Sequence, residues 1–360
     1  MERFGFVGLP NAGKSSLYNA LAGGGALAAP YAFATVDPNV GVARVPDRRL
    51  DALAEMSKTK TIVHASVQFV DIAGLVKGAA QGEGLGNRFL AHIREVDAIV
   101  FVLRAFVDDD VPGSHDPVDQ LETLEIELVY ADLETLEKQI DKRRKAARAD
   151  KSLVDEVSAM EAAIAHLQAG HPLYRTDMSA DDLAHIKHHF LLTAKPALAL
   201  VNFDEAQLED PDPILEPVRA AFGADGADRV IGLCIQLEAE AALLDPESRV
   251  EMLEALGLGE GALPTFLHTA YQMLGLRTFF TTGEKETRAW TFRAGYRAPQ
   301  CAGVIHTDFE RGFIRAETIH WDELLELGSW SKARDAGKLR IEGKDYEVVD
   351  GDVMEFRFNV

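Results

Sequence analysis

The sequence is poor in the features that mark secreted and membrane proteins. It has only two cysteines, Cys234 and Cys301, in 360 residues. They are isolated in the chain, which argues against a disulfide scaffold and is typical of a reducing compartment. No run of about 20 apolar residues occurs, so we expect no membrane span. Met1-Glu2-Arg3 runs directly into an apolar segment, so we expect no signal peptide and a cytoplasmic location.

Positive charge is also scarce. The chain has 37 lysines and arginines against 58 acidic residues, for a net charge of −21. This balance argues against non-specific binding to DNA or to anionic membranes. Any contact with RNA must therefore use a local basic patch.

The most informative motif begins at Gly8. Residues 8–15 read G-L-P-N-A-G-K-S and fit the phosphate-binding pattern G-x-x-x-x-G-K-[S/T], between an apolar run and a helical-looking segment. Glycines allow the backbone to curl around phosphate oxygens, Lys14 can reach the β- and γ-phosphates, and the Ser15 hydroxyl can ligate Mg²⁺. The nucleotide contacts expected here come from Asn11, Ala12, Gly13, Lys14, Ser15 and Ser16.

A second motif supplies further metal and phosphate ligands. An apolar run at 67–70 ends in D-I-A-G, which places the Asp71 carboxylate near the metal and the Gly74 amide near the γ-phosphate. Between the two motifs, Thr35 is the candidate second hydroxyl on Mg²⁺. Such a threonine would order its loop only when a γ-phosphate is present. Taken alone, Thr35 would be an ordinary loop residue.

Apolar runs and helical segments alternate along much of the chain. The expected strands are 4–8, 67–71, 98–104, 197–202 and 230–235. This alternation predicts an α/β domain, a doubly wound and mostly parallel sheet, with its site at the carboxyl ends of the strands. We expect this nucleotide-binding domain to be split into 1–120 and 191–277.

Residues 121–190 contain no evident strand. Leucines recur there at helical spacing, a break follows near 150–152, and Gly170 could end a second helix. The pattern predicts a helical hairpin. Its basic tip is a candidate contact for a phosphate backbone, although a solvated helix face is an equal alternative; the tip residues are Lys138, Lys142, Arg143, Arg144, Lys145, Arg148 and Lys151.

The last eighty or so residues change character. Short strands are expected at 278–282, 288–292, 339–341, 346–349 and 353–359, with a helix at 316–327. We therefore expect a small α+β binding domain at 278–360.

The segment after the strand at 197–201 bears on the choice of base. It reads Asn202-Phe203-Asp204-Glu205, where guanine-binding proteins have N-K-x-D. Asn202 can pair with N6 and N7 of adenine, and Phe203 can place its ring or backbone beside the base. The alternative is that Glu205 or Asp204 recognises guanine. Leu233 and Cys234 would contact the base through backbone groups.

Taken together, the sequence resembles the YchF subfamily of Obg-like P-loop NTPases over essentially its full length. The likeness rests on G-L-P-N-A-G-K-S, on D-I-A-G-L-V-K-G-A, and on H-T-D-F-E-R-G-F-I-R-A-E at 306–317. It implies a cytoplasmic, Mg²⁺-dependent ATPase that binds the ribosome, with large-subunit rRNA as partner. It also implies a coiled-coil insert and a C-terminal TGS domain with a β-grasp fold.

Two features bear on turnover. Leu75 stands where related GTPases have a water-orienting glutamine, a hydrophobic substitution typical of the family. The resemblance implicates a histidine in the loop after 98–104, and His115, a few residues late, is the candidate there. A monovalent cation such as K⁺, held near Asn11, is another candidate for assisting hydrolysis. Two alternatives remain open: a GTPase, or a nucleotide-gated binding protein with negligible turnover.

Three further histidines invite a metal interpretation. His185, His188 and His189 have helical spacing. No fourth ligand converges on them in the sequence, so a metal site there is disfavoured.

Overall fold

The computed structural model describes residues 1–23, 40–72, 85–108, 113–223 and 226–359. The chain forms two compact units, one made of residues 1–43 and 68–263 and the other of residues 44–67 and 264–360. The expected C-terminal boundary at 278 therefore falls inside the second unit, which also takes 44–67 from the N-terminal part of the chain.

The first unit is built on a six-stranded sheet in the order β2-β4-β1-β5-β6-β7. Neighbouring strands from β4 through β7 are parallel. All seven residues of β5 and all six of β6 are buried, because helices cover both faces of a central parallel strand. The strands are β1 (Arg3–Val7), β2 (Val40–Arg44), β4 (Ser66–Asp71), β5 (Ala98–Arg104), β6 (Ala197–Asn202) and β7 (Val230–Leu233).

Helices connect these strands. They are α1 (Lys14–Gly23), α3 (Leu85–Arg94), α4 (Pro117–Ala147), α5 (Val154–Gln168), α6 (Ala180–Ile186), α7 (Asp212–Phe222), α8 (Gly226–Arg229), α9 (Ile235–Ala242) and α10 (Pro246–Ala255). The described residues also form the 3₁₀ turns η1 (Lys151–Leu153), η2 (Leu173–Arg175), η3 (Lys187–His189) and η4 (Ala206–Leu208). All five strands expected from apolar runs are present in this sheet. The sequence analysis missed β2, a short strand with alternating burial at the edge.

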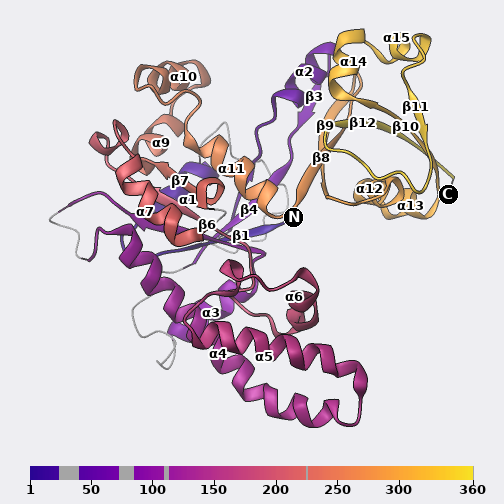
Figure 1. Ribbon diagram of the computed structural model, residues 1–360. Helices are drawn as coiled ribbons and strands as arrows, with labels where there is room; N and C mark the ends of the chain where they lie inside the picture. The colour runs from indigo at the N-terminus through magenta and orange to yellow at the C-terminus, as the bar shows by residue number, and fades with distance from the viewer. Residues whose placement is uncertain (24–39, 73–84, 109–112, 224–225, 360) are drawn as a thin grey trace. The chain divides into compact units, whose positions relative to one another are not determined.

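The helical hairpin expected between 121 and 190 is present. Figure 1 shows α4 and α5 side by side, joined by a short turn. Asp116 begins α4 by accepting from the amides of Val118 and Asp119, and Pro117 occupies the first turn. The hairpin has its own apolar core, which includes Leu136, Ile140, Met160, Ala163 and Leu167.

The second unit contains a mixed sheet in the order β11-β10-β12-β8-β9-β3. Its strands are β3 (Thr61–Val63), β8 (Leu276–Thr281), β9 (Glu286–Arg293), β10 (Phe313–His320), β11 (Arg340–Glu342) and β12 (Asp352–Phe358). Its helices are α2 (Arg48–Met56), α11 (Ala262–Met273), α12 (Ala298–Ile305), α13 (Thr307–Arg311), α14 (Trp321–Leu327) and α15 (Trp330–Asp335).

Two expectations for this unit were wrong. The helix expected at 316–327 begins only at Trp321, because Phe313–His320 pairs with β12 as an antiparallel strand. The segment 346–349 is not a regular strand and forms only an isolated bridge between Glu347 and Arg297. In the first case a pairing between distant residues overrides the local preference for helix, and in the second the segment has a single bridge partner and no strand ladder.

Candidate functional site

The turn between β1 and α1 has the backbone conformation that phosphate binding requires. Gly13 has φ of 103°, and a Cβ there would lie 2.6 Å from Asn202 Nδ2. A Cβ on Gly8 would lie 2.5 Å from the carbonyl oxygen of Val102 on β5. Only glycine fits at either position, so both glycines of the motif are explained by close approach and, for Gly13, by backbone angle.

Lys14 lies inside this turn. Its ammonium donates to the carbonyls of Gly8 at 3.1 Å and Leu9 at 2.9 Å. The residue is only 7% exposed. Burial lowers the pKa of Lys14, and the nearby Asp71 carboxylate opposes that shift. The lysine is therefore held in the turn by carbonyl oxygens that a phosphate could replace as its partners.

The expected metal ligands Ser15 and Asp71 are in direct contact. Ser15 Oγ donates to Asp71 Oδ2 at 2.8 Å, although the two residues are 56 positions apart. Their closeness follows from the sheet, since β1 and β4 are parallel neighbours and Asp71 is paired with Phe6. A hydroxyl and a carboxylate oxygen are the hard ligands that Mg²⁺ prefers, so the two residues fit this ion. Thr35, the third expected metal ligand, lies outside the described residues, as do Gly74, whose amide is expected near the γ-phosphate, and Leu75.

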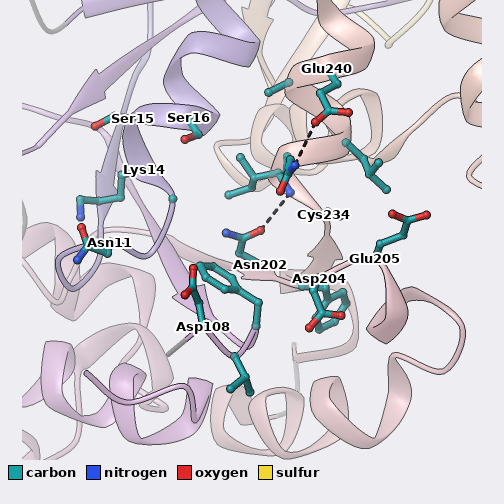
Figure 2. Close-up of a pocket in the computed structure, with 18 of the residues that line it drawn as sticks. Asn11, Lys14, Ser15, Ser16, Asp108, Asn202, Asp204, Glu205, Cys234 and Glu240 are labelled. Carbon is teal, nitrogen blue, oxygen red and sulfur yellow. Dashed lines mark hydrogen bonds between the residues drawn. The ribbon is translucent and has the colours of Figure 1, made fainter. Parts of the chain in front are cut away.

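A cavity of about 990 Å³ extends from this turn across the carboxyl ends of β1, β5 and β6. Figure 2 shows Asn11, Lys14 and Ser15 at one end and Glu205 and Glu240 at the other. The cavity is in the place expected from the parallel sheet. Of the remaining expected contacts, Gly13, Ser16, Asn202, Phe203 and Cys234 also line it.

Asn202 connects the two ends of the cavity through two side-chain hydrogen bonds. Its Nδ2 donates to the carbonyl of Ala12 at 3.1 Å, and its Oδ1 accepts from the amide of Ile235 at 3.1 Å. The residue is 6% exposed. Asn202 thus fixes the phosphate-binding turn to the start of α9, and its side-chain amide can still donate one further hydrogen bond and accept another. The sequence analysis missed this connecting role.

The other residues at the base end contribute unequally. Phe203 lines the cavity but is only 2% exposed, and it packs in the core. Phe203 N donates to the carbonyl of Leu233 at 2.9 Å. Asp204 Oδ1 accepts from the amide of Gln207. Glu205 lines the cavity and is exposed.

Cys234 is a buried free cysteine at the start of α9. Burial raises the pKa of its thiol, so the thiolate needed for nucleophilic chemistry is disfavoured. The expected role of Cys234, a contact through its backbone, remains a prediction. Gln236 and Glu240 also line the cavity and are bonded to each other at 3.1 Å. No motif marked them in the sequence.

The geometry does not bring His115 to the cavity. His115 is exposed and precedes Asp116, the first residue of the α4 cap. It is not among the described residues that line the cavity, whereas Phe106, Val107 and Asp108 from the same loop are. Its catalytic role remains a prediction without geometric support.

Comparison with known proteins identifies the family. Residues 3–150 match the profile described as "50S ribosome-binding GTPase", and residues 276–359 match the C-terminal profile of YchF GTPases, described as "Protein of unknown function (DUF933)". Proteins named "Ribosome-binding ATPase YchF" from Bacillus subtilis and Escherichia coli O157:H7 are each 46% identical to this chain, over 99% of both chains.

The fold agrees with these sequence matches. The solved structure of the Schizosaccharomyces pombe YchF GTPase superposes with a TM-score of 0.88 at 36% identity, covering 99% of this chain and 97% of that one. This likeness confirms the expected fold class, a P-loop α/β domain with a helical hairpin and a C-terminal domain. Among the described residues, no helix has the length and apolar character needed to cross a membrane. The chain belongs to the YchF family of P-loop nucleoside triphosphatases.

Proposed function

We propose that this protein is a Mg²⁺-dependent nucleoside triphosphatase that prefers ATP and uses the bound nucleotide as a switch for ribosome binding. The observation that carries the proposal is the contact between Ser15 and Asp71 beside the buried ammonium of Lys14. Two hard oxygen ligands and a cation next to a glycine-rich turn are what a metal–triphosphate complex requires.

At the phosphate end, the chain's own groups position and neutralise the substrate. Lys14 would exchange its carbonyl partners for β- and γ-phosphate oxygens, which carry more negative charge. Ser15 and Asp71 would hold Mg²⁺, with Thr35 as the third expected ligand. The ion, when bound, supplies the positive charge that stabilises the phosphoryl group during transfer.

At the base end, the available groups favour adenine. Asn202 retains a lone pair that can accept from N6 and an amide hydrogen that can donate to N7. The carboxylate of Glu205 has no hydrogen-bond or ion-pair partner among the described residues, so it is free to face the base. It is one methylene longer than the aspartate of N-K-x-D and need not reach the two adjacent donors of guanine.

Competition between ATP and GTP for the purified protein tests the choice of base. We expect ATP to bind at least as tightly as GTP, and Glu205→Asp to shift the preference toward GTP. Phe203 is left unchanged because its ring is buried, and Glu240→Asp, at the same end of the cavity, is the matched control. A clear preference of the wild-type protein for GTP would overturn the adenine assignment.

Ribosome binding is supported by the relatives' names and by the helical hairpin. Four exposed cations near its tip have no ion-pair partner among the described residues: Lys142, Lys145, Arg148 and Lys151. Arg143 and Arg144 are instead paired with acidic residues. We infer that the four unpaired cations contact large-subunit rRNA, and that the C-terminal unit adds a second contact. A ribosomal role places the protein in the cytoplasm, in agreement with its two free, buried cysteines.

A nucleotide-gated binding protein with negligible turnover is the second candidate. The exposed position of His115, away from the cavity lining, favours it. Phosphate release should be measured with and without ribosomes, and ribosome co-sedimentation should be measured with ATP, a non-hydrolysable analogue and ADP. Multiple turnover supports the enzyme, whereas nucleotide-dependent binding without turnover supports the second candidate.

A further inference from the structure

A cluster of metal-ligating groups lies in the helical region, outside the nucleotide cavity. Glu156 comes from the first turn of α5, and His188 and His189 come from η3. Glu156 Oε1 is 3.0 Å from His188 Nε2 and 3.1 Å from His189 Nε2. The three candidate ligand atoms all lie within 4.8 Å of one another. The fold thus supplies the carboxylate that the histidine spacing alone lacked, and His185 is not part of the cluster.

The separations of the carboxylate oxygen from the two imidazole nitrogens suit a tetrahedral ion. Zinc binds imidazole nitrogen and carboxylate oxygen at about 2.0–2.2 Å, which puts two ligand atoms of a tetrahedron about 3.3–3.5 Å apart. The two observed distances are a few tenths of an ångström shorter than this separation. Two imidazoles and one carboxylate form a known zinc donor set that leaves a fourth position for water. An ion could therefore enter with small side-chain adjustments.

Burial favours a built site over a chance surface cluster. The side chain of Glu156 is 8% exposed and that of His189 is 1% exposed, whereas His188 is half exposed. A buried carboxylate needs a compensating positive charge. His188 provides the side open to solvent through which an ion could enter.

In the structure, the Arg143 guanidinium supplies this compensating positive charge. Its Nε lies 3.1 Å from Glu156 Oε1, and its Nη2 lies 3.4 Å from His188 Nε2. A divalent cation among the three ligands would bring positive charge to the same place, so the ion and the guanidinium must compete. The Arg143 side chain is one-third exposed and can swing into solvent without backbone movement.

We propose that Glu156, His188 and His189 form a binding site for Zn²⁺ or a chemically similar transition-metal ion. The ion displaces Arg143 from the carboxylate. Each imidazole then binds through the Nε2 lone pair, and the proton that Nε2 donated to Glu156 moves to Nδ1 or is released to solvent. The bound ion joins α5 of the hairpin to η3, in the segment that leads back to β6.

Metal titration of the full-length, tag-free protein tests this site. The metal-stripped protein is held in excess Mg²⁺, which competes with Zn²⁺ for oxygen ligands such as the proposed Mg²⁺ ligands Ser15 and Asp71. Zn²⁺ binding is measured by calorimetry, and Co²⁺ binding is measured by visible absorption, where intense bands report tetrahedral geometry. We expect one site per chain, and binding of Zn²⁺ should increase hydrogen-exchange protection in α5.

Matched variants separate this site from others. His188→Ala and Glu156→Gln should each weaken Zn²⁺ binding by at least about tenfold, the lower end of what disturbing a metal site costs. Arg143→Gln should strengthen binding, because the competing cation is gone. His185→Ala, in the same region but outside the cluster, should bind like the wild type. The half-exposed His188 is preferred to the buried His189 because its replacement is compatible with folding.

Three results would overturn the proposal. The first is no saturable Zn²⁺ binding by the wild-type protein. The second is equal affinity of wild type, His188→Ala and Glu156→Gln. The third is weaker binding in Arg143→Gln, which would show that the guanidinium supports the ion instead of competing with it.

Discussion

Replacing Asn202 by alanine tests the connection across the nucleotide cavity. The change removes one bond to the carbonyl of Ala12 and one to the amide of Ile235, both at 3.1 Å. Each buried polar group left without a partner costs about 1–3 kcal/mol, so the two together cost about 2–6 kcal/mol. Because Asn202 is 6% exposed, water cannot readily replace these bonds in the native structure.

The loss should appear both in stability and in nucleotide affinity. Both bonds hold the phosphate-binding turn itself, so their loss loosens this turn for ATP and GTP alike. We expect both dissociation constants to rise by at least about tenfold, which corresponds to about 1.4 kcal/mol. If Asn202 also pairs with adenine, the affinity for ATP should fall further than the affinity for GTP.

Calorimetry with ATP and with GTP measures these two effects separately, and denaturant unfolding measures the change in stability. Gln236→Ala is the matched control, because Gln236 lines the same cavity but is bonded to Glu240 and not to the phosphate-binding turn. Affinities within twofold of wild type for both nucleotides would refute the connecting role. A fall of equal size for ATP and GTP would refute adenine recognition by Asn202.

Three further predictions concern charge and catalysis. Lys14→Ala should weaken ATP binding about 30-fold or more, since losing a charged contact to a buried phosphate costs about 2–5 kcal/mol; calorimetric affinity within twofold of wild type would contradict the phosphate-site assignment. His115→Ala should keep kcat within about twofold, because an exposed side chain away from the cavity is not placed for general-base catalysis; a 100-fold fall in a steady-state assay would restore its proposed role. Neutralising the four unpaired hairpin cations should weaken ribosome co-sedimentation and reduce its salt dependence by roughly one unit per lost phosphate contact. The four cations are Lys142, Lys145, Arg148 and Lys151, and Lys138→Gln is the control, because Lys138 is already paired with Glu134. An unchanged salt slope in the fourfold variant would show that these cations are only solvated surface.

The phosphate end of the site could be read from the sequence because its chemistry is local. The turn from Gly8 to Ser15 is one continuous segment, and glycine is the residue that its backbone angles and close approaches demand. The buried strands β5 and β6 could also be predicted from the sequence, since a central parallel strand must be apolar on both faces. The position of Asp71 beside Ser15 followed once a parallel sheet was inferred.

Tertiary structure alone decided the contacts that join distant segments. Asn202 meets Ala12 across 190 positions, and Glu156 meets His188 and His189 across 32 and 33. Residues 61–63 join the C-terminal sheet by pairing with β9. Residues 316–320 became strand because β12 offered a partner, despite a local pattern that suggested helix. Local sequence determines backbone preference and side-chain chemistry, but which distant groups satisfy one another depends on how the whole chain packs.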